Sequence, residues 1–339
     1  MVKHAPPAAT GPDTGSATRL AAVLFDADLA AHRIDIAGHQ GPSRDDQLLW
    51  IDAQVAKDQA LPEQLRRYGL DPTHLHPQRP GATGMVVDGD WTYLYAEALN
   101  SPSDRRFSSE ALVVAIGPNL VVTAHRKPIE FLTRLLENES GYLRIGNLHA
   151  GSFAASLLDR MLTDYLDARD AFESTLDRIE LLVLRRPQAR HLAELQQLRR
   201  QASKLRRYLA VQRDMFDALA RPDFSSGQPE EVARHWQLLS ARYARTMAAA
   251  ESARELVNGS FDVYASRVAQ GTNETMRVLT VVTVVLGTLA VVAGVMGMNF
   301  RADLFDSGDA GFWWSVAGML AFAVLAITVS VGWNLMRRK

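Results

Sequence analysis

The chain has 339 residues, with 37 lysines and arginines, 38 aspartates and glutamates, and no cysteine. A formal net charge of -1 gives no basis for a nucleic-acid partner. The lack of cysteine excludes disulfides, thiolate metal ligands and a cysteine nucleophile. The length is sufficient for two or three domains. Charged residues are frequent in the first 277 positions and rare beyond them, so the sequence predicts a polar N-terminal part and a membrane-embedded C-terminal part.

Residues 1–145 are predicted to form a tail followed by an α/β domain. Residues 1–20 are rich in Pro, Gly, Ser, Thr and Ala and lack the apolar core of a signal peptide, so we expect a disordered cytoplasmic tail. Residues 21–145 contain strand-like runs separated by turn residues. The runs are "AAVLF", "LLWIDAQV", "GMVVDGDWTYLYAEAL" and "ALVVAIGPNLVVTAH". Between them, "LPEQLRRYGLD" has helical periodicity and ends near Gly69.

The segment "THLHP" holds His74 and His76, the closest pair of histidines on the chain. A histidine-rich tract would indicate metal binding. A single His-x-His in a loop bounded by proline is more often solvated than bound to metal, so we expect these two side chains to be solvated.

Long helical patterns fill residues 146–277. Apolar residues recur every three or four positions from about Leu148 to Leu184, and a second amphipathic stretch runs from His191 to about Leu219. The linker "RPDFSSGQP" interrupts the pattern. After it, no proline occurs before the membrane segment, which predicts one very long helix that enters the membrane directly.

Two segments are long and apolar enough to span a bilayer. Residues 278–298 carry no charged side chain, and residues 312–336 form the second apolar run, joined to the first by the loop 299–311. Tryptophans lie near both ends of the second run, as in an interfacial belt. Arg277 and the basic terminus 337–339 flank the pair, whereas the loop is mainly acidic, so both termini are expected in the cytoplasm. The sequence therefore predicts a multi-pass protein of the inner (cytoplasmic) membrane, in contact with the lipid bilayer.

One face of the first membrane segment is polar or small. Its members are spaced alternately by three and four residues, which places them on a single helix face. They are Asn273, Met276, Thr280, Thr283, Gly287, Ala290 and Gly294. Such a stripe is either a seam for close helix packing or the wetted side of a pore. Two membrane spans cannot enclose a pore alone. If the stripe lines a pore, the protein must therefore be a homo-oligomer.

The segments "TNETMRVLT" and "AGVMGMNF", together with the order of the upstream elements, resemble the CorA family of magnesium transporters. The resemblance implies a homopentamer whose pore is lined by the first membrane helix. It assigns selectivity to Gly297, Met298 and Asn299, with Asn299 in a ring that meets hydrated Mg²⁺. It also assigns an apolar constriction to Met276 and Leu279. Transport of Mg²⁺, with Co²⁺ and Ni²⁺ as further candidates, is the implied function.

Other features of the resemblance are less complete. Met296 stands where many members have an aromatic residue, and Gly287-Thr288 stands where members often have Met-Pro. Asp303 and Asp306 are candidates for recruiting cations at the outer mouth, or they are ordinary loop residues. Mg²⁺ is expected as the transported ion and as a possible regulatory ligand, with no other cofactor. The regulatory carboxylates cannot be assigned among Glu251, Glu255 and Asp262.

Three alternatives stay open. A proton-coupled Zn²⁺ transporter of the related ZntB branch is one, although those relatives usually have Ile where this chain has Met298. A non-conducting membrane scaffold is the second. The third is a membrane-tethered enzyme, but the sequence has no glycine-rich phosphate loop, G-x-S-x-G or H-E-x-x-H motif, and we therefore expect no enzymatic activity.

Overall fold

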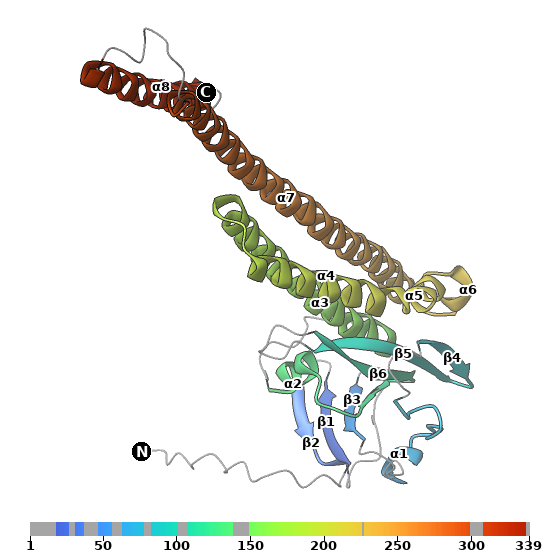
Figure 1. Ribbon diagram of the computed structural model, residues 1–339. Coiled ribbons are helices and arrows are strands. Elements are labelled where there is room, and N and C mark those ends of the chain that lie inside the picture. The colour runs from blue at the N-terminus through green and yellow to red at the C-terminus, as the bar shows by residue number, and fades with distance from the viewer. Residues whose placement is uncertain are drawn as a thin grey trace, which may run out of the picture. The chain divides into compact units, whose positions relative to one another are not determined.

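The structure is a computed structural model that describes residues 18–26, 31–36, 47–55, 63–77, 83–100, 107–137, 149–225, 227–298 and 308–336. The chain divides into two compact units. The first consists of Met1–Leu181 and Ala189–Phe261, and the second of Leu182–Gln188 and Asp262–Lys339. Most of the predicted tail, residues 1–17, lies outside the described residues. Figure 1 labels the elements along the chain.

The first unit contains a seven-stranded sheet in the order β2-β1-β3-β7-β6-β5-β4. Neighbouring strands are antiparallel, except for β3 and β7, which run parallel. The strand-like runs found in the sequence are confirmed, and one strand, β2, was not predicted. The strands are β1 (Arg19–Phe25), β2 (Ala31–Ile34), β3 (Leu48–Gln54), β4 (Gly84–Asp88), β5 (Trp91–Asn100), β6 (Ser108–Gly117) and β7 (Leu120–His125).

Both faces of the central strands are buried, because apolar residues occupy successive positions rather than alternate ones. In β3, Leu48 and Trp50 belong to one hydrophobic cluster, and Leu49 and Ile51 to the other. The second cluster is closed by α1 (Glu63–Arg66) and the loop that follows it. The predicted helix is therefore confirmed as a shorter one, and Gly69 has the positive φ of 77° that helix-ending residues often adopt.

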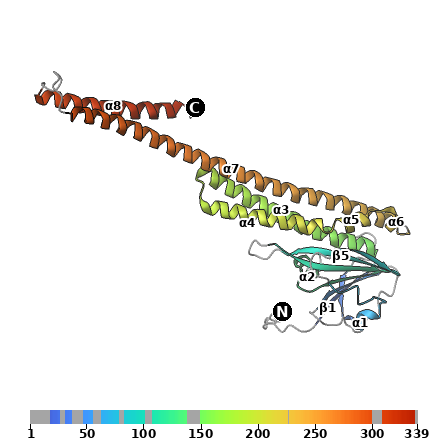
Figure 2. The same ribbon diagram turned by 45° about the vertical axis from the view of Figure 1, so that its right-hand side comes forward.

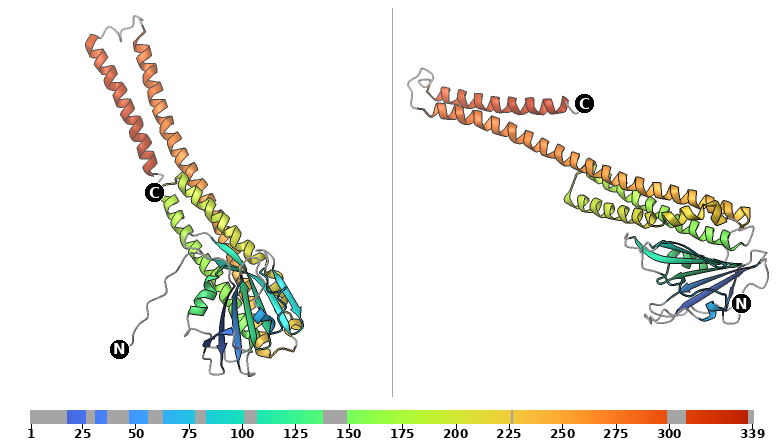
Figure 3. Two further views of the ribbon diagram at one scale, coloured as in Figure 1. Left: turned by 90° about the horizontal axis from the view of Figure 1, so that it is seen from below. Right: turned by 90° about the vertical axis from the view of Figure 1, so that its right-hand side faces the viewer.

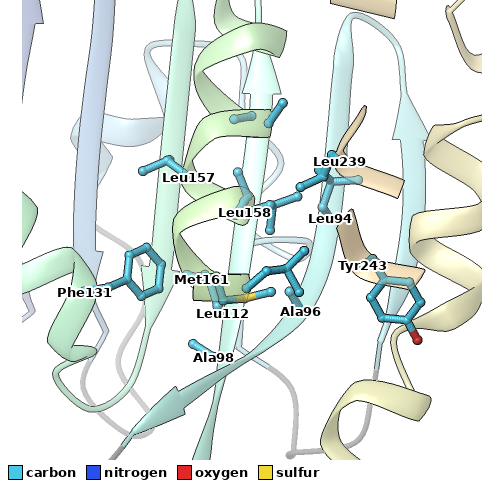
Figure 4. Close-up of a cluster of buried hydrophobic side chains, with 14 of the residues drawn as sticks. Leu94, Ala96, Ala98, Leu112, Phe131, Leu157, Leu158, Met161, Leu239 and Tyr243 are labelled. Carbon is cyan, nitrogen blue, oxygen red and sulfur yellow. The ribbon is translucent and has the colours of Figure 1, made fainter. Parts of the chain in front are cut away.

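The opposite face of the sheet is covered by helices. These are α2 (Glu130–Glu137), α3 (Ala150–Arg185), α4 (Ala189–Ala210), α5 (Arg213–Leu219), α6 (Pro222–Ser225) and the first part of α7 (Glu230–Met296). Figure 4 shows part of the resulting core, in which Leu158 of α3 lies beside Leu94 of β5 and Leu239 of α7. The cluster brings together strands and helices that lie more than a hundred residues apart in the sequence, and it fixes the start of α7 to the sheet.

The amphipathic stretch from His191 to Leu219 forms two helices, α4 and α5, rather than one continuous helix. The chain leaves the helix at Val211-Gln212 and starts α5. Gln212 is fully buried, and its side-chain amide donates to the Tyr208 carbonyl (2.8 Å) and accepts from the Glu97 amide (3.1 Å). These contacts satisfy the polar groups at the break, and the amphipathic pattern alone does not reveal them.

A buried polar group lies between the parallel strands β3 and β7. His125 Nε2 is 3.2 Å from Asp52 Oδ2, and the Thr123 hydroxyl donates to the other carboxylate oxygen at 2.5 Å. Trp50 Nε1 donates to Thr123 Oγ1 at 3.1 Å. Burial opposes the charged form of His125, but the hydrogen bond and the negative charge of Asp52 outweigh it and raise the pKa of His125 above its ordinary 6.5. This pair therefore favours an imidazolium inside the sheet.

In the second unit, α8 (Gly308–Met336) lies alongside the C-terminal part of α7, as Figures 2 and 3 show from several directions. α7 has 67 residues without a break, which confirms the predicted helix that continues into the membrane segment. α8 begins four residues before Phe312, where the second membrane segment was expected to start.

Candidate ion-conduction path on helix α7

α7 is a regular helix through the whole polar stripe. Its threonine hydroxyls donate to carbonyls one turn earlier, from Thr280 to Met276 O at 2.9 Å and from Thr283 to Leu279 O at 2.8 Å. Thr288 does the same to Val284 O at 2.9 Å. These bonds satisfy the hydroxyls within the helix, while each oxygen retains acceptor capacity toward a neighbour or a water molecule. The helix is continuous across Gly287-Thr288, where members of the family that the sequence resembles often have Met-Pro.

One face of α7 is covered by α8. Val285, with 9% of its surface exposed, is the single buried residue between Asp262 and Met296. An apolar groove between the two helices lies beside it, and Met296 Sδ lies 4.0 Å from Ser315 Oγ on α8. The groove is lined by Leu286, Leu289, Ala290, Ala293, Val316, Met319, Leu320 and Ala323. This face cannot be identified from the sequence alone, although the small residues Ala290, Ala293 and Ala323 are typical of close helix packing.

The polar stripe lies on the face of α7 turned away from α8. At about 100° per residue, its members fall about 140° to 240° around the helix from Val285. Every member is exposed in the single chain. Beyond the adjacent backbone of α7 itself, no atom of the described residues lies within 4 Å of where a Cβ on Gly287 or Gly294 would stand. From Asn273 to Gly294 the stripe extends for about 31 Å, at about 1.5 Å per residue, which matches the thickness of a bilayer core.

Two predicted pore residues lie toward the edge of this face. Ala290 contributes to the groove shared with α8, so it lies at the border between the covered and the uncovered face. Leu279 is about 120° from Val285 around the helix. Met276 is more central, and 58% of its surface and 58% of that of Leu279 are exposed in the single chain. An apolar constriction formed by these two positions therefore requires Met276 to project farther into the path than Leu279.

The C-terminal end of α7 is described as far as Met298. α7 ends at Met296, and the Gly297 and Met298 amides close the last turn by donating to Ala293 O (2.9 Å) and Val295 O (3.2 Å). Gly297 and Met298 are thus placed at the C-terminus of the stripe helix. Asn299, the predicted selectivity residue and metal contact, and the predicted recruitment residues Asp303 and Asp306 lie outside the described residues.

The carboxylates considered as regulatory ligands belong to the part of α7 that precedes the apolar membrane segment. Glu251 Oε1 lies 3.4 Å from Arg206 Nε of α4, so it takes part in a partly exposed ion pair within the first unit. Glu255 and Asp262 are exposed. In the single chain, these three side chains do not come together as a cation site.

Two described helices are long and apolar enough to cross a membrane: α7, through its C-terminal window, and residues Asp309–Ala326 of α8. Apart from the face that the two helices share, both windows are exposed in the single chain. Trp313 and Trp314 near the start of α8 are more than 60% exposed, as interfacial tryptophans would be. The arrangement is that of a helical hairpin with one lipid-compatible surface and one polar stripe.

Comparison with known proteins gives a consistent family assignment. The chain is 30% identical over 146 residues to the cobalt/magnesium transport protein CorA of Thermotoga maritima, a match covering 43% of this chain and 41% of that protein. It is 29% identical over 223 residues to the divalent cation transporter CmaX of Pseudomonas aeruginosa, covering 64% of this chain and 63% of that one. The matched stretches therefore span less than two thirds of either relative.

The fold agrees with this assignment. The complete CorA magnesium transporter structure from Methanocaldococcus jannaschii superposes with a TM-score of 0.67 at 21% identity, covering 91% of this chain and 96% of that one. The model of the CorA-like Mg²⁺ transporter protein family matches residues 45–329, which is most of the sequence and includes the polar stripe. The chain belongs to the CorA-like Mg²⁺ transporter protein family.

Proposed function

We propose that this protein conducts hydrated divalent cations, principally Mg²⁺, through a pore lined by α7 in a homopentamer of the inner membrane. The observation that carries the proposal is the position of the polar stripe: its residues are exposed in the single chain, and all but Ala290 at its border lie away from the face that α8 covers. A single hairpin cannot enclose a path. Self-association that turns the stripes inward gives a wetted lumen and keeps the apolar surfaces toward lipid.

The chemistry of the stripe suits a strongly hydrated ion. Mg²⁺ releases its water reluctantly, so neutral hydroxyl, amide and carbonyl oxygens that contact its hydration shell are better suited than a tight cage of carboxylates. Asn273 and the two threonines offer such oxygens along the helix, and Asn299 would offer a ring of amides at the outer end. Neutral rings also bind weakly enough to allow release, as conduction requires.

The membrane potential can drive cation entry without a coupled reaction. An inside-negative potential favours entry by about 2.3 kcal/mol per elementary charge for each 100 mV, and hence by about twice that for a divalent ion. Met276 and Leu279 would form the gate, because an apolar ring loses its water when it narrows. With both termini in the cytoplasm, cations enter at Asn299 and leave past Asn273.

Uptake by liposomes containing the purified full-length protein tests the proposal. Mg²⁺, Co²⁺, Ni²⁺ and Zn²⁺ are offered separately, with and without a proton gradient, at a fixed membrane potential. We expect Mg²⁺ entry that follows the potential and is independent of the proton gradient. Zn²⁺ entry that requires the gradient would favour the ZntB-type mechanism instead, and absence of flux for every cation would favour a scaffold in which the stripe is only a packing seam.

The acidic outer loop provides a second prediction. If Asp303 and Asp306 concentrate cations at the mouth, replacing both by asparagine lowers the rate of Mg²⁺ entry at low ionic strength and has little effect at high ionic strength, where exposed charges are screened. A reduction of equal size at both ionic strengths would contradict recruitment through long-range electrostatics.

A further inference from the structure

A cluster of potential metal ligands belongs to the first unit, whereas the polar stripe belongs to the second. Asp71, His74 and Asp88 each place a ligand atom within 4.8 Å of the others. His74 Nε2 is 3.9 Å from Asp88 Oδ2. Asp71 and His74 are partly buried, while Asp88 is exposed. This arrangement changes the sequence-based expectation for "THLHP", in which both histidines were predicted to be solvated, because only His76 is exposed.

The fold brings the three residues together from two separate segments. Asp71 and His74 belong to the loop after α1, which is anchored on either side by the buried Leu70 and Leu75. Asp88 is the last residue of β4 and pairs with Trp91 across a two-residue turn at Gly89. Gly89 has a φ of 57°, which favours glycine and makes the tight hairpin possible.

The His74 ring is positioned by two aromatic residues of β5. The His74 ring packs against Tyr93 with a centroid separation of 4.8 Å, and its Nδ1 lies 3.3 Å from the Tyr95 hydroxyl oxygen. When Nδ1–H donates to that oxygen, Nε2 keeps its lone pair and faces Asp88. This is the arrangement found around metal-binding histidines, in which a second partner fixes the ring and the tautomer.

Asp71 is likewise held in place. Its Oδ1 accepts the Thr73 amide at 2.8 Å, and the Asp71 amide donates to the Tyr93 hydroxyl at 3.2 Å. Because the Thr73 amide contacts Oδ1, Oδ2 of Asp71 is left to face a cation. Two anionic oxygens and one imidazole nitrogen thus converge on one point of the surface.

We propose that Asp71, His74 and Asp88 bind a divalent transition cation of the Zn²⁺, Co²⁺ and Ni²⁺ class within a single chain. An imidazole ligand suits these ions, whereas Mg²⁺ prefers oxygen ligands alone and keeps most of its water. One or more water molecules would complete the coordination on the exposed side of Asp88. The site depends on no part of the proposed conduction path.

The distances allow this coordination with a small movement. Zn²⁺ lies about 2.0–2.2 Å from nitrogen and oxygen ligands, so the ligand atoms of a tetrahedral site are about 3.4 Å apart. The His74–Asp88 separation exceeds this value by about 0.5 Å, and no pair of the three ligand atoms is more than 4.8 Å apart. Asp88 is a surface side chain and can rotate inward, whereas the tyrosines hold His74 where it is.

Zinc binding by the full-length protein in detergent tests the site. Equilibrium dialysis against Zn²⁺ is carried out in excess Mg²⁺, which occupies the oxygen-only sites of the conduction path. We expect one Zn²⁺ per chain that Mg²⁺ does not displace. His74→Gln and Asp88→Asn should each remove this ion, while His76→Gln should retain it. Circular dichroism spectra and melting temperatures identical to wild type would show that these surface substitutions leave the fold intact.

Two further measurements separate coordination from a simple ion pair between His74 and Asp88. Co²⁺ bound at the site should give visible absorption bands of four- or five-coordinate geometry, and these bands should disappear in His74→Gln. Tyr95→Phe removes the partner of Nδ1 and should weaken Zn²⁺ affinity about 10-fold or more without abolishing it. Equal Zn²⁺ stoichiometry and affinity in wild type and His74→Gln would overturn the proposal, whatever the outcome of the transport experiments.

Discussion

Replacing His125 by glutamine tests the buried pair that links the two parallel strands. In the native protein, His125 is 3% exposed, contacts Asp52 at 3.2 Å through Nε2, and contacts the Lys127 carbonyl at 2.7 Å through Nδ1. The substitution removes the positive charge and leaves the Asp52 carboxylate, 7% exposed, with the Thr123 hydroxyl as its remaining described partner.

The expected cost follows from the burial of the carboxylate. Removing one member of a buried charge pair costs about 3–5 kcal/mol, because the other charge stays in a low-dielectric site. Glutamine retains an N–H donor, so we expect a value near the lower end, about 3 kcal/mol. For a unit of this size, that corresponds to a melting temperature lower by about 6–12 °C. The double variant Asp52→Asn/His125→Gln should lose less than the sum of the two single variants.

The pH dependence gives the decisive readout, measured as thermal unfolding by circular dichroism. Because the pKa of His125 is raised in the folded state above 6.5, the stability that its charge contributes is fully present below 6.5 and is lost as pH rises through the folded value. The difference in melting temperature between wild type and His125→Gln should therefore be largest at mildly acidic pH and shrink as pH rises. A difference that is constant with pH, or that grows on the alkaline side, would refute the reasoning.

Two further substitutions probe the packing of α3 and the stripe. A Cβ on Gly151 would stand 2.6 Å from Val232 Cγ1, so Gly151→Ala should destabilise the first unit by about 1–2 kcal/mol. In a Val232→Ala background the same change should stabilise it by about 0.5–1 kcal/mol, and destabilisation there by chemical denaturation would contradict the steric cause. Gly287→Phe should sharply reduce cation flux in liposomes with assembly unchanged, because this position is open in the single chain and faces the proposed lumen. Gly318→Phe on α8, where the position is also open, serves as the matched control. Equal flux in the two variants would argue against a lumen on this face.

The strands and the long helices were predictable because their signals are local. The apolar run of β3 and the turn residues around Asn119, whose φ is 53°, predict strands and a hairpin without knowledge of their partners. β2 was missed because its four residues include the exposed His32 and Arg33 and carry no apolar alternation. The break at Gln212 was missed because it depends on hydrogen bonds to Glu97, more than a hundred residues away.

The same distinction applies to the candidate sites. The spacing of three and four residues defines the stripe on α7 from the sequence alone, because a helix converts that spacing into one face. The face that α8 covers could not be chosen, since valine and leucine surround the helix on its other sides. The cluster at His74 was not predicted because Asp88 reaches it only through the register of the β4–β5 hairpin.

The most direct test of a conducting path ending in the Gly-Met-Asn segment is Mg²⁺ uptake by liposomes containing the Asn299→Ala variant. Size-exclusion chromatography would confirm that its oligomeric state matches that of wild type, and His76→Gln provides a control outside the proposed path. We expect wild-type flux in the control and a flux that is abolished or sharply reduced in Asn299→Ala, because the ring of amide oxygens that meets the hydrated ion is lost. Unchanged flux in a correctly assembled Asn299→Ala variant would contradict the proposed selectivity ring.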